Sequence, residues 1–303
     1  MKTVYLFVVG VLISMTPLVA QQATDTPADV LEKSLLWEVT GNGLEQTSYV
    51  YGTIHMIDKD DFFFTEATEE AMGKAERFTF EIDMEDMNDM GKIMPIMMKA
   101  FMEGDTTLSD LLTDEEYQLV SDHFKKIGLP LMMLERIKPM FLSALTGEEM
   151  MMPGQEGGSM VSYEFEIMKK AQERKKPIEG LETMEFQMSL FDQIPYEDQA
   201  QMLVESIQSP TDSSADNQLD MLVQIYKNQD IEAMLSMMDD KEAGMGKYED
   251  ILLVSRNKNW IPAMEKMMKE NTTFFAVGAG HLGGENGVIR LLRKAGYTLK
   301  PLY

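Results

Sequence analysis

Residues 274–281 read FFAVGAGH: a short apolar run ends in glycine, and His281 follows after two more small residues. Residues 48–55 read SYVYGTIH and repeat the pattern, with Gly52 three positions before His55. Both apolar runs predict β-strands, because β-branched and aromatic residues favour strands. A glycine at a strand end lets the backbone turn sharply or approach another segment closely. We therefore expect each histidine to project from the carboxyl end of a strand, where ligands bind in open α/β sheets.

The segments around these two strands predict an α/β or α+β fold. Strands are separated by long helical stretches, which favours a central mixed sheet with flanking helices. A Met-rich helical insertion is expected over about 84–160. Strands are expected at 35–40 and 48–54, joined as a hairpin through Gly41-Asn42-Gly43, and at 78–82, 177–181, 274–277 and 297–299. Helices are expected over 65–74, 163–174 and 287–295 and over most of 184–270, with a polar break at 209–216.

The amino-terminal residues predict export. A basic residue precedes an apolar run at 4–13, and a small residue closes the segment before polar residues begin. This pattern predicts a signal peptide over 1–20, a linker over 21–30 and a single domain over 31–303. The run is shorter than the roughly 20 apolar residues of a membrane-spanning helix. We therefore expect no stable membrane insertion and an exported, periplasmic or secreted protein.

The amino-acid composition excludes several kinds of partner and active site. Asp and Glu number 51 against 27 Lys and Arg, for a net charge of −24, and the chain has no Cys and 3 His. We expect no nucleic-acid partner, because Lys and Arg supply affinity for phosphate backbones. The lack of Cys removes disulfides, thiolate nucleophiles and thiolate metal sites. Imidazole chemistry must use His55, His123 or His281, and we expect His123 on a helix surface.

The two histidines that share a local pattern are candidates for one site. Two neutral imidazoles that converge at a sheet edge can hold a divalent metal ion, with carboxylates completing its coordination. The alternative is that His55 and His281 are unrelated strand-end residues, one of them a hydrogen-bonded core histidine.

Several further segments, in order along the chain, match one family. They are 36–39 (LWEV), 51–56 (YGTIHM), 80–83 (FEID), 177–183 (PIEGLET) with Gln187, Arg256-Asn257 with Trp260, and 277–282 (VGAGHL). Together they resemble the TraB/GumN family, whose animal relatives include the Tiki metalloproteases, over about residues 34–302. One departure is the segment 161–164 (VSYE), where the family usually carries a Gly-hydrophobic-Asp pattern. For that reason Glu164 is left outside the predicted site.

This resemblance implies a metal-dependent hydrolase, a peptidase that acts on peptide or protein substrates. It implies His55 and His281 as metal ligands, joined by Glu81 as the matching acid. Glu182 could then act as general base, and Arg256 could stabilise a developing oxyanion. The alternatives are a capping or ion-pair role for Glu81, and a direct pair between Glu182 and Arg256. Imidazole and carboxylate ligands suit Mn, Co, Fe or Zn as the metal.

Two other functions stay open. One is a non-catalytic binder that sequesters a peptide signal or haem in the same cleft. The other is a copper carrier that uses thioethers, because Cu(I) prefers sulfur ligands. Met90, Met94, Met97 and Met98 recur at helical spacing, which is typical of a core or groove face. We expect these residues to pack, or to form a flexible lid over a peptide-sized cleft, in preference to binding copper.

Overall fold

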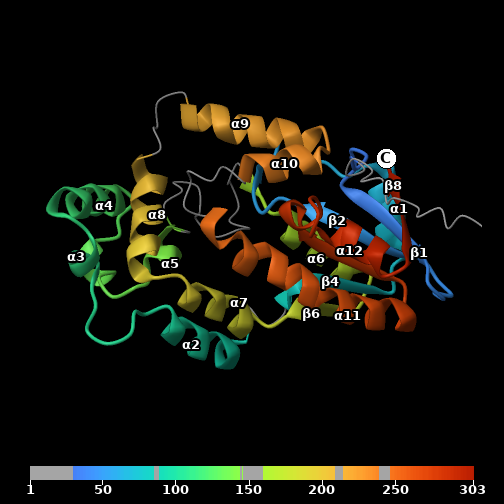
Figure 1. The fold of residues 1–303 in the computed structure, drawn as a ribbon, viewed down its shortest axis with the longest axis horizontal. Coiled ribbons are helices and arrows are strands. Elements are labelled where there is room, and N and C mark those ends of the chain that lie inside the picture. The colour runs from blue at the N-terminus through green and yellow to red at the C-terminus, as the bar shows by residue number, and fades with distance from the viewer. Residues whose placement is uncertain (1–29, 85–88, 144, 146–159, 209–213, 239–245) are drawn as a thin grey trace, which may run out of the picture. The chain divides into compact units, whose positions relative to one another are not determined.

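A six-stranded mixed sheet forms the centre of the fold in the computed structural model (Figure 1). The structure describes residues 30–84, 89–143, 145, 160–208, 214–238 and 246–303. Leu31–Tyr303 make one compact unit. The predicted signal peptide and all but the last residue of the predicted linker lie outside the described residues. Within the described residues, no helix combines the length and apolarity needed to cross a membrane.

The sheet has the order β6-β4-β7-β2-β1-β8. Neighbours among β6, β4, β7 and β2 run parallel, whereas β1 pairs antiparallel with both β2 and β8. This arrangement confirms the predicted central mixed sheet with flanking helices. The strands are β1 (Leu36–Gly41), β2 (Ser48–Thr53), β4 (Arg77–Ile82), β6 (Ile178–Glu182), β7 (Thr273–Gly278) and β8 (Tyr297–Leu302).

The predicted hairpin is confirmed. Strands β1 and β2 pair in register Leu36↔Tyr51 to Val39↔Ser48. Gly41, Asn42 and Gly43 all adopt positive φ between the two strands. A left-handed backbone at three successive positions is accessible because two of them are glycine and the third is asparagine.

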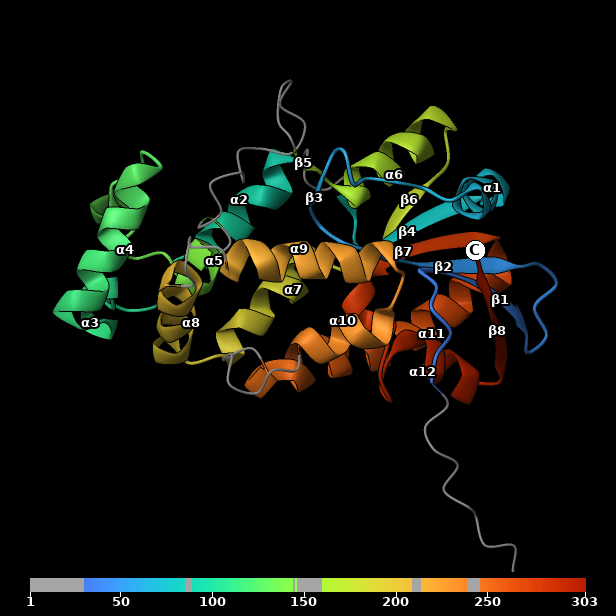
Figure 2. The ribbon, with the colours of Figure 1, turned by 90° about the horizontal axis from the view of Figure 1, so that it is seen from above.

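Helices cover both faces of the sheet. Figure 2 shows α1 and α6 on one side and α11 and α12 on the other. Thr65 caps α1 and Ser162 caps α6, since each hydroxyl accepts a hydrogen bond from a backbone amide of the first turn. The bounds are α1 (Glu66–Lys74), α6 (Tyr163–Glu173), α11 (Ser255–Glu270) and α12 (Val288–Lys294). A separate short pair joins β3 (Ile57–Asp58) to β5 (Met160–Val161).

A further run of helices lies between β6 and β7 in sequence. They are α7 (Met184–Leu190), η3 (Phe191–Gln193), α8 (Tyr196–Gln208), α9 (Ser214–Lys227), α10 (Ile231–Met238), η4 (Gly246–Tyr248) and the π-helical turn η5 (Asp250–Val254), which continues into α11. The predicted helical character of this region is confirmed. The predicted break was too long, because α9 begins at Ser214, and residues 209–213 lie outside the described part of the chain.

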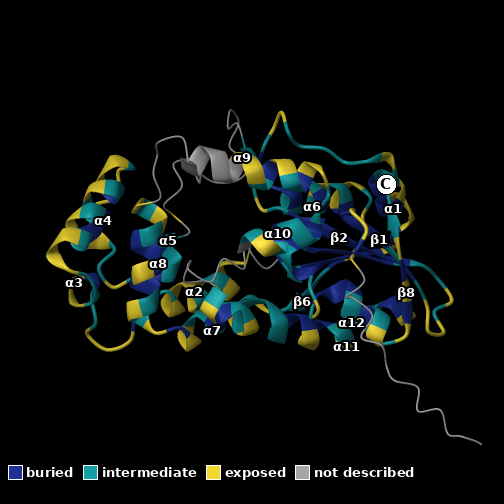
Figure 3. Cartoon of the chain, turned by 45° about the horizontal axis from the view of Figure 1, so that its top comes forward, coloured by how far each residue is buried: buried dark blue, intermediate teal, exposed yellow. Residues whose placement is uncertain are grey.

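Most of the core is centred on strand β7. Phe274 is fully buried, and its ring lies 5.9 Å from that of Tyr51 on β2 and 5.6 Å from that of Phe78 on β4. Figure 3 shows dark blue, the colour of buried residues, concentrated on the central sheet. The aromatic rings join three neighbouring strands, so the sheet that carries the histidine segments is rigidly packed.

The predicted helical insertion forms a second hydrophobic cluster. Its helices pack Leu108, Val120 and Phe124 against Leu203 and Val204 of α8. The elements are α2 (Met90–Lys99), α3 (Leu108–Leu111), α4 (Asp114–Lys126), η2 (Leu131–Met133) and α5 (Pro139–Ser143). Residues 85–88, 144 and 146–159 of the insertion lie outside the described part.

The expected packing of the α2 methionines is wrong. Met90, Met94, Met97 and Met98 are 52 to 68% exposed, and α2 has no buried residue. None of the four lines either of the cavities described below. Helical spacing identifies one face of a helix, but it does not say whether another element covers that face.

Truncation of the central aromatic residue tests this account of the core. Phe274→Ala should lower the free energy of unfolding by about 3–5 kcal/mol, because it removes a fully buried ring. Met98→Ala, at an exposed position, should change it by less than about 0.5 kcal/mol. Urea denaturation followed by circular dichroism measures both. Equal effects for the two variants would contradict a core centred on β7.

Candidate functional site

The two histidine segments leave the sheet at the same edge. Strands β2 and β7 are parallel neighbours, and Thr53 is in register with Gly278. A Cβ atom on Gly52 would lie 3.1 Å from the Cα of Ala279, and one on Gly278 would lie 3.2 Å from Glu81 Oε1. The expectation that glycine allows a close approach is therefore confirmed at both positions. The absence of a side chain at Gly52 leaves room for the backbone of Ala279, and its absence at Gly278 leaves room for the Glu81 carboxylate.

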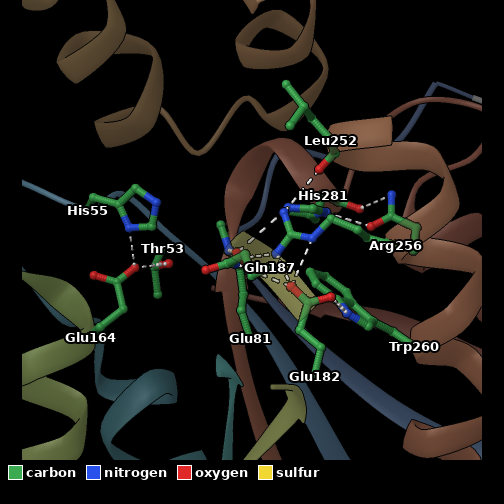
Figure 4. Close-up of polar contacts among 12 residues, drawn as sticks. Thr53, His55, Glu81, Glu164, Glu182, Gln187, Leu252, Arg256, Trp260 and His281 are labelled. Carbon is green, nitrogen blue, oxygen red and sulfur yellow. Dashed lines mark hydrogen bonds and ion pairs between the residues drawn. The ribbon is translucent and has the colours of Figure 1, made fainter. Parts of the chain in front are cut away.

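Arg256, on α11, lies at the centre of a buried polar cluster (Figure 4). All five of its N–H groups have acceptors. Nε donates to Glu182 Oε1 at 2.9 Å, and Nη2 donates to Glu182 and to Glu81 Oε2 at 2.5 Å each. Nη1 donates to the carbonyl oxygen of Leu252 at 3.0 Å and to His281 Nε2 at 3.1 Å. The guanidinium thus has no donor left for a substrate oxyanion in this arrangement.

Glu81 is the penultimate residue of strand β4, and its carboxylate accepts several hydrogen bonds. Besides Arg256, the Gly278 amide donates to its Oε1 at 2.9 Å and Gln187 donates to its Oε2 at 3.2 Å. Burial by itself raises the pKa of this carboxyl group, but interactions with His281, Arg256 and the Gly278 amide outweigh it and lower the pKa to about 2. Glu81 is therefore ionised at neutral pH, and the predicted alternative of an ion-pair role is present.

Glu182, the last residue of β6, also contacts the Arg256 guanidinium. Its Oε2 accepts from Trp260 Nε1 at 3.0 Å, and its Oε1 also accepts from Gln187 at 3.2 Å. The direct pair between Glu182 and Arg256 that we considered from the sequence is thus formed. The carboxylate holds the guanidinium in place, and this geometry favours a positioning role for Glu182 over that of general base.

His281 is buried and fully hydrogen-bonded. Its Nδ1 lies 2.6 Å from Asn257 Oδ1, and its ring stacks 4.4 Å from that of Trp260. Because the amide oxygen accepts, Nδ1 carries the proton and Nε2 accepts from Arg256. Burial lowers the pKa of His281 to about 4, and the Arg256 cation adds to this effect against the opposing charge of Glu81. The imidazole is neutral at pH 7.

His55 has a different environment. Its side chain is 80% exposed, and its Nδ1 lies 3.0 Å from Glu164 Oε1. Glu164 is only 14% exposed and also accepts from Thr53 Oγ1 at 2.7 Å and from Ser162 Oγ at 2.9 Å. The hydrogen bond to Glu164 raises the pKa of His55 above its ordinary value of 6.5, although solvent around the exposed ring screens the carboxylate and limits the rise.

Glu164 is the site residue that the sequence reasoning left out. The departure from the family's Gly-hydrophobic-Asp pattern pointed away from it. A sequence signal did exist: Ser162 caps α6, which places Glu164 in the first turn of that helix. The contact with His55 depends on the two-residue β3–β5 pair, which brings residues 160–161 beside 57–58 and is too short to be predicted. His123 lies on α4, as a partly exposed residue outside the site.

Two cavities meet at this cluster. The larger has a volume of about 530 Å³ and the smaller about 300 Å³. Both are lined by His55, Met56, Glu81 and Gln187. Apolar side chains such as Leu190, Leu252 and Leu253 form much of the larger wall, and Ile82 and Phe165 line the smaller one. His55 and Glu81 therefore stand where the two cavities join.

The predicted ligands do not fit a divalent metal as they are placed. The donor types are suitable, since imidazole nitrogen and carboxylate oxygen bind Mn, Co, Fe or Zn. However, the Arg256 guanidinium already contacts His281 Nε2 and both carboxylates, Glu81 and Glu182. In the described residues, no three His, Asp or Glu side chains gather closely enough to hold an ion. A cation beside His281 Nε2 would have to displace this guanidinium.

The fold and the site define a class of protein: a mixed α/β sheet with two Gly-x-x-His segments at one edge, around a buried Arg–carboxylate cluster. The family profile of the TraB/PrgY/gumN family matches residues 35–301. The chain belongs to this family, as the sequence motifs predicted. Comparison with curated proteins and with solved structures gave no significant match.

Removal of the central cation tests the cluster. Arg256→Gln should lower the free energy of unfolding by about 3–5 kcal/mol, because two buried carboxylates lose their cation. Lys74→Gln, which removes an exposed pair with Glu70, should cost less than about 1 kcal/mol. Adding Glu81→Gln and Glu182→Gln to the Arg256 variant should restore part of the loss. Chemical denaturation measures all three, and additive losses would show that the charges do not interact.

Proposed function

We propose that this chain is an exported hydrolase that acts on peptide or protein substrates. The observation that carries the proposal is the exposed, carboxylate-bound His55 at the junction of two cavities with largely apolar walls. A concave apolar site with a few convergent polar groups is the usual setting of a substrate site. Membership of the TraB/PrgY/gumN family agrees with this proposal without specifying an activity.

The cavities favour an apolar segment of substrate that carries no acidic groups. Glu81 and Glu182 place two negative charges around the single positive charge of Arg256, and Glu249 adds a carboxylate to the larger cavity. The local charge is therefore negative and repels a free carboxylate. Apolar side chains on both sides of the reacting bond can be buried against Leu190 and Leu253 or against Phe165.

The divalent metal stays a prediction from the sequence. If such an ion binds, it would polarise a substrate carbonyl and activate water. No step proposed here depends on it, because Arg256 contacts the nitrogen and carboxylates that would hold it. The chain's own residues bind and orient the substrate, exclude water along the apolar walls and leave His55 able to exchange a proton.

A non-catalytic peptide binder is the second candidate. It is favoured by one observation: every N–H group of Arg256 and both ring nitrogens of His281 are already hydrogen-bonded within the protein. A site built only to bind an apolar peptide would need no reactive group in the inner cluster, the buried polar residues around Arg256. Cleavage separates the two functions, because a binder retains its peptide intact.

Incubation with a diverse peptide mixture tests hydrolysis. The wild-type protein, assayed with and without added Mn, Co, Fe or Zn, should create new peptide termini that mass spectrometry detects. His55→Ala should reduce the rate at least about hundredfold, the usual contribution of a general base or acid. His123→Gln on α4 should leave the rate unchanged. Binding of peptides without any new termini, under every metal condition, would support the binder instead.

A further inference from the structure

The hydrogen bonds of the inner cluster leave it without a free reactive group. Asn257 fixes the Nδ1 proton of His281, and its amide group donates to the carbonyl oxygens of His281 and Asn286. Gln187 donates to both Glu81 and Glu182. Together with the five occupied N–H groups of Arg256, these bonds make the cluster a closed network. Its members are well placed to support a site but poorly placed to exchange protons.

His55 is the exception. One ring nitrogen, Nδ1, is held by Glu164, and no hydrogen bond to its Nε2 is present among the described residues. The ring lines both cavities, and Figure 4 shows it with Glu164 and Thr53, apart from the cluster around Arg256. In the neutral imidazole, a carboxylate that accepts the Nδ1 proton leaves Nε2 with its lone pair available, which is the tautomer that a general base requires.

Glu164 is itself firmly placed. Thr53 Oγ1 and Ser162 Oγ both donate to it, and Ser162 also caps the helix that carries Glu164. The pair therefore joins the end of β2 to the start of α6, and the imidazole cannot turn over without losing a hydrogen bond to a carboxylate of low exposure.

We propose that His55 is the general base of this site, that Glu164 positions it, and that Arg256 stands as the resident cation where a metal would otherwise bind. This inference rests on the proposed hydrolase function and specifies how it is carried out. His55 Nε2 takes a proton from a water molecule, whose oxygen adds to the substrate carbonyl carbon. The carbon–nitrogen bond then breaks, and the imidazolium returns the proton to the leaving amine. Water is consumed, and an acid and an amine are released.

The kinetic test separates a positioning role from a merely structural one. Glu164→Ala should lower kcat at least about tenfold with a much smaller change in KM, because the apolar walls bind the substrate whereas this carboxylate acts on His55. Glu164→Asp should restore much of kcat. Glu166→Ala, two positions along the same helix, is the matched control and should behave as wild type. Activity should survive dialysis against EDTA. Loss of activity on dialysis, or an unchanged kcat in Glu164→Ala, overturns the proposal.

A second readout does not depend on activity. Protein labelled with ¹⁵N-histidine has three imidazole ring systems, and His55→Gln identifies the signals of His55 by their loss. In the neutral ring of the wild type, the proton should be on Nδ1. In Glu164→Ala it should move predominantly to Nε2, while the His281 signals stay unchanged. Equimolar Zn²⁺ should not shift the Nε2 signals of His55 and His281 together.

The two readouts distinguish the failure of each idea. If the wild type cleaves no peptide but the His55 tautomer depends on Glu164, the hydrolase proposal fails and the pairing stands. If the wild type cleaves peptides and Glu164→Ala cleaves equally well, hydrolysis stands and the general-base assignment is wrong. A joint Zn²⁺ shift of both histidines shows that Arg256 yields its place to a metal, which overturns the assignment of Arg256 as the resident cation.

Discussion

The buried charge pairing around Arg256 holds the functional end of this fold together. One guanidinium on α11 is bonded to carboxylates that end two neighbouring parallel strands, Glu81 on β4 and Glu182 on β6, and to His281 after β7. Burial of a cation costs desolvation free energy unless hydrogen-bonded carboxylates compensate for it. Removal of either the guanidinium or the carboxylates leaves an uncompensated buried charge. The Arg256 guanidinium therefore fixes the carboxyl ends of three strands, which line or adjoin the two cavities.

This pairing divides the polar residues by role. The inner residues satisfy one another, and burial keeps His281 neutral. His55 and Glu164 lie outside that network, on the segment after β2 and at the start of α6. The two histidines share a motif in sequence but not an environment: one is packed against Trp260, and the other is largely exposed. Equivalent spacing thus places both histidines at one edge of the sheet, but the residues around each one determine its protonation and hydrogen bonding.

Much of the fold could be predicted from the sequence, because the patterns that specify its strands, turns and helices are local. Apolar runs such as 274–277, the Gly-Asn-Gly turn and the helical segment 65–74 each specify a nearby structure, and all are present. The shared Gly-x-x-His pattern also placed His55 and His281 at one edge of the sheet, and the family resemblance added Glu81 to them. The sequence could not predict that all donors of Arg256 are used, because that depends on contacts between residues up to 175 positions apart. Nor could it show that the α2 methionines remain uncovered.

The position of β7 has a consequence for how the chain folds. This strand lies between β2 and β4, yet it comes more than 190 residues after β4 begins, since Arg77 pairs with Thr273. Until residues 273–278 are available, β2 and β4 have no common neighbour and the Phe274 ring is missing from the core. Contacts of such large sequence separation slow folding, because loop closure precedes the stabilising interactions. The central sheet therefore cannot be completed before residues 273–278 have been synthesised.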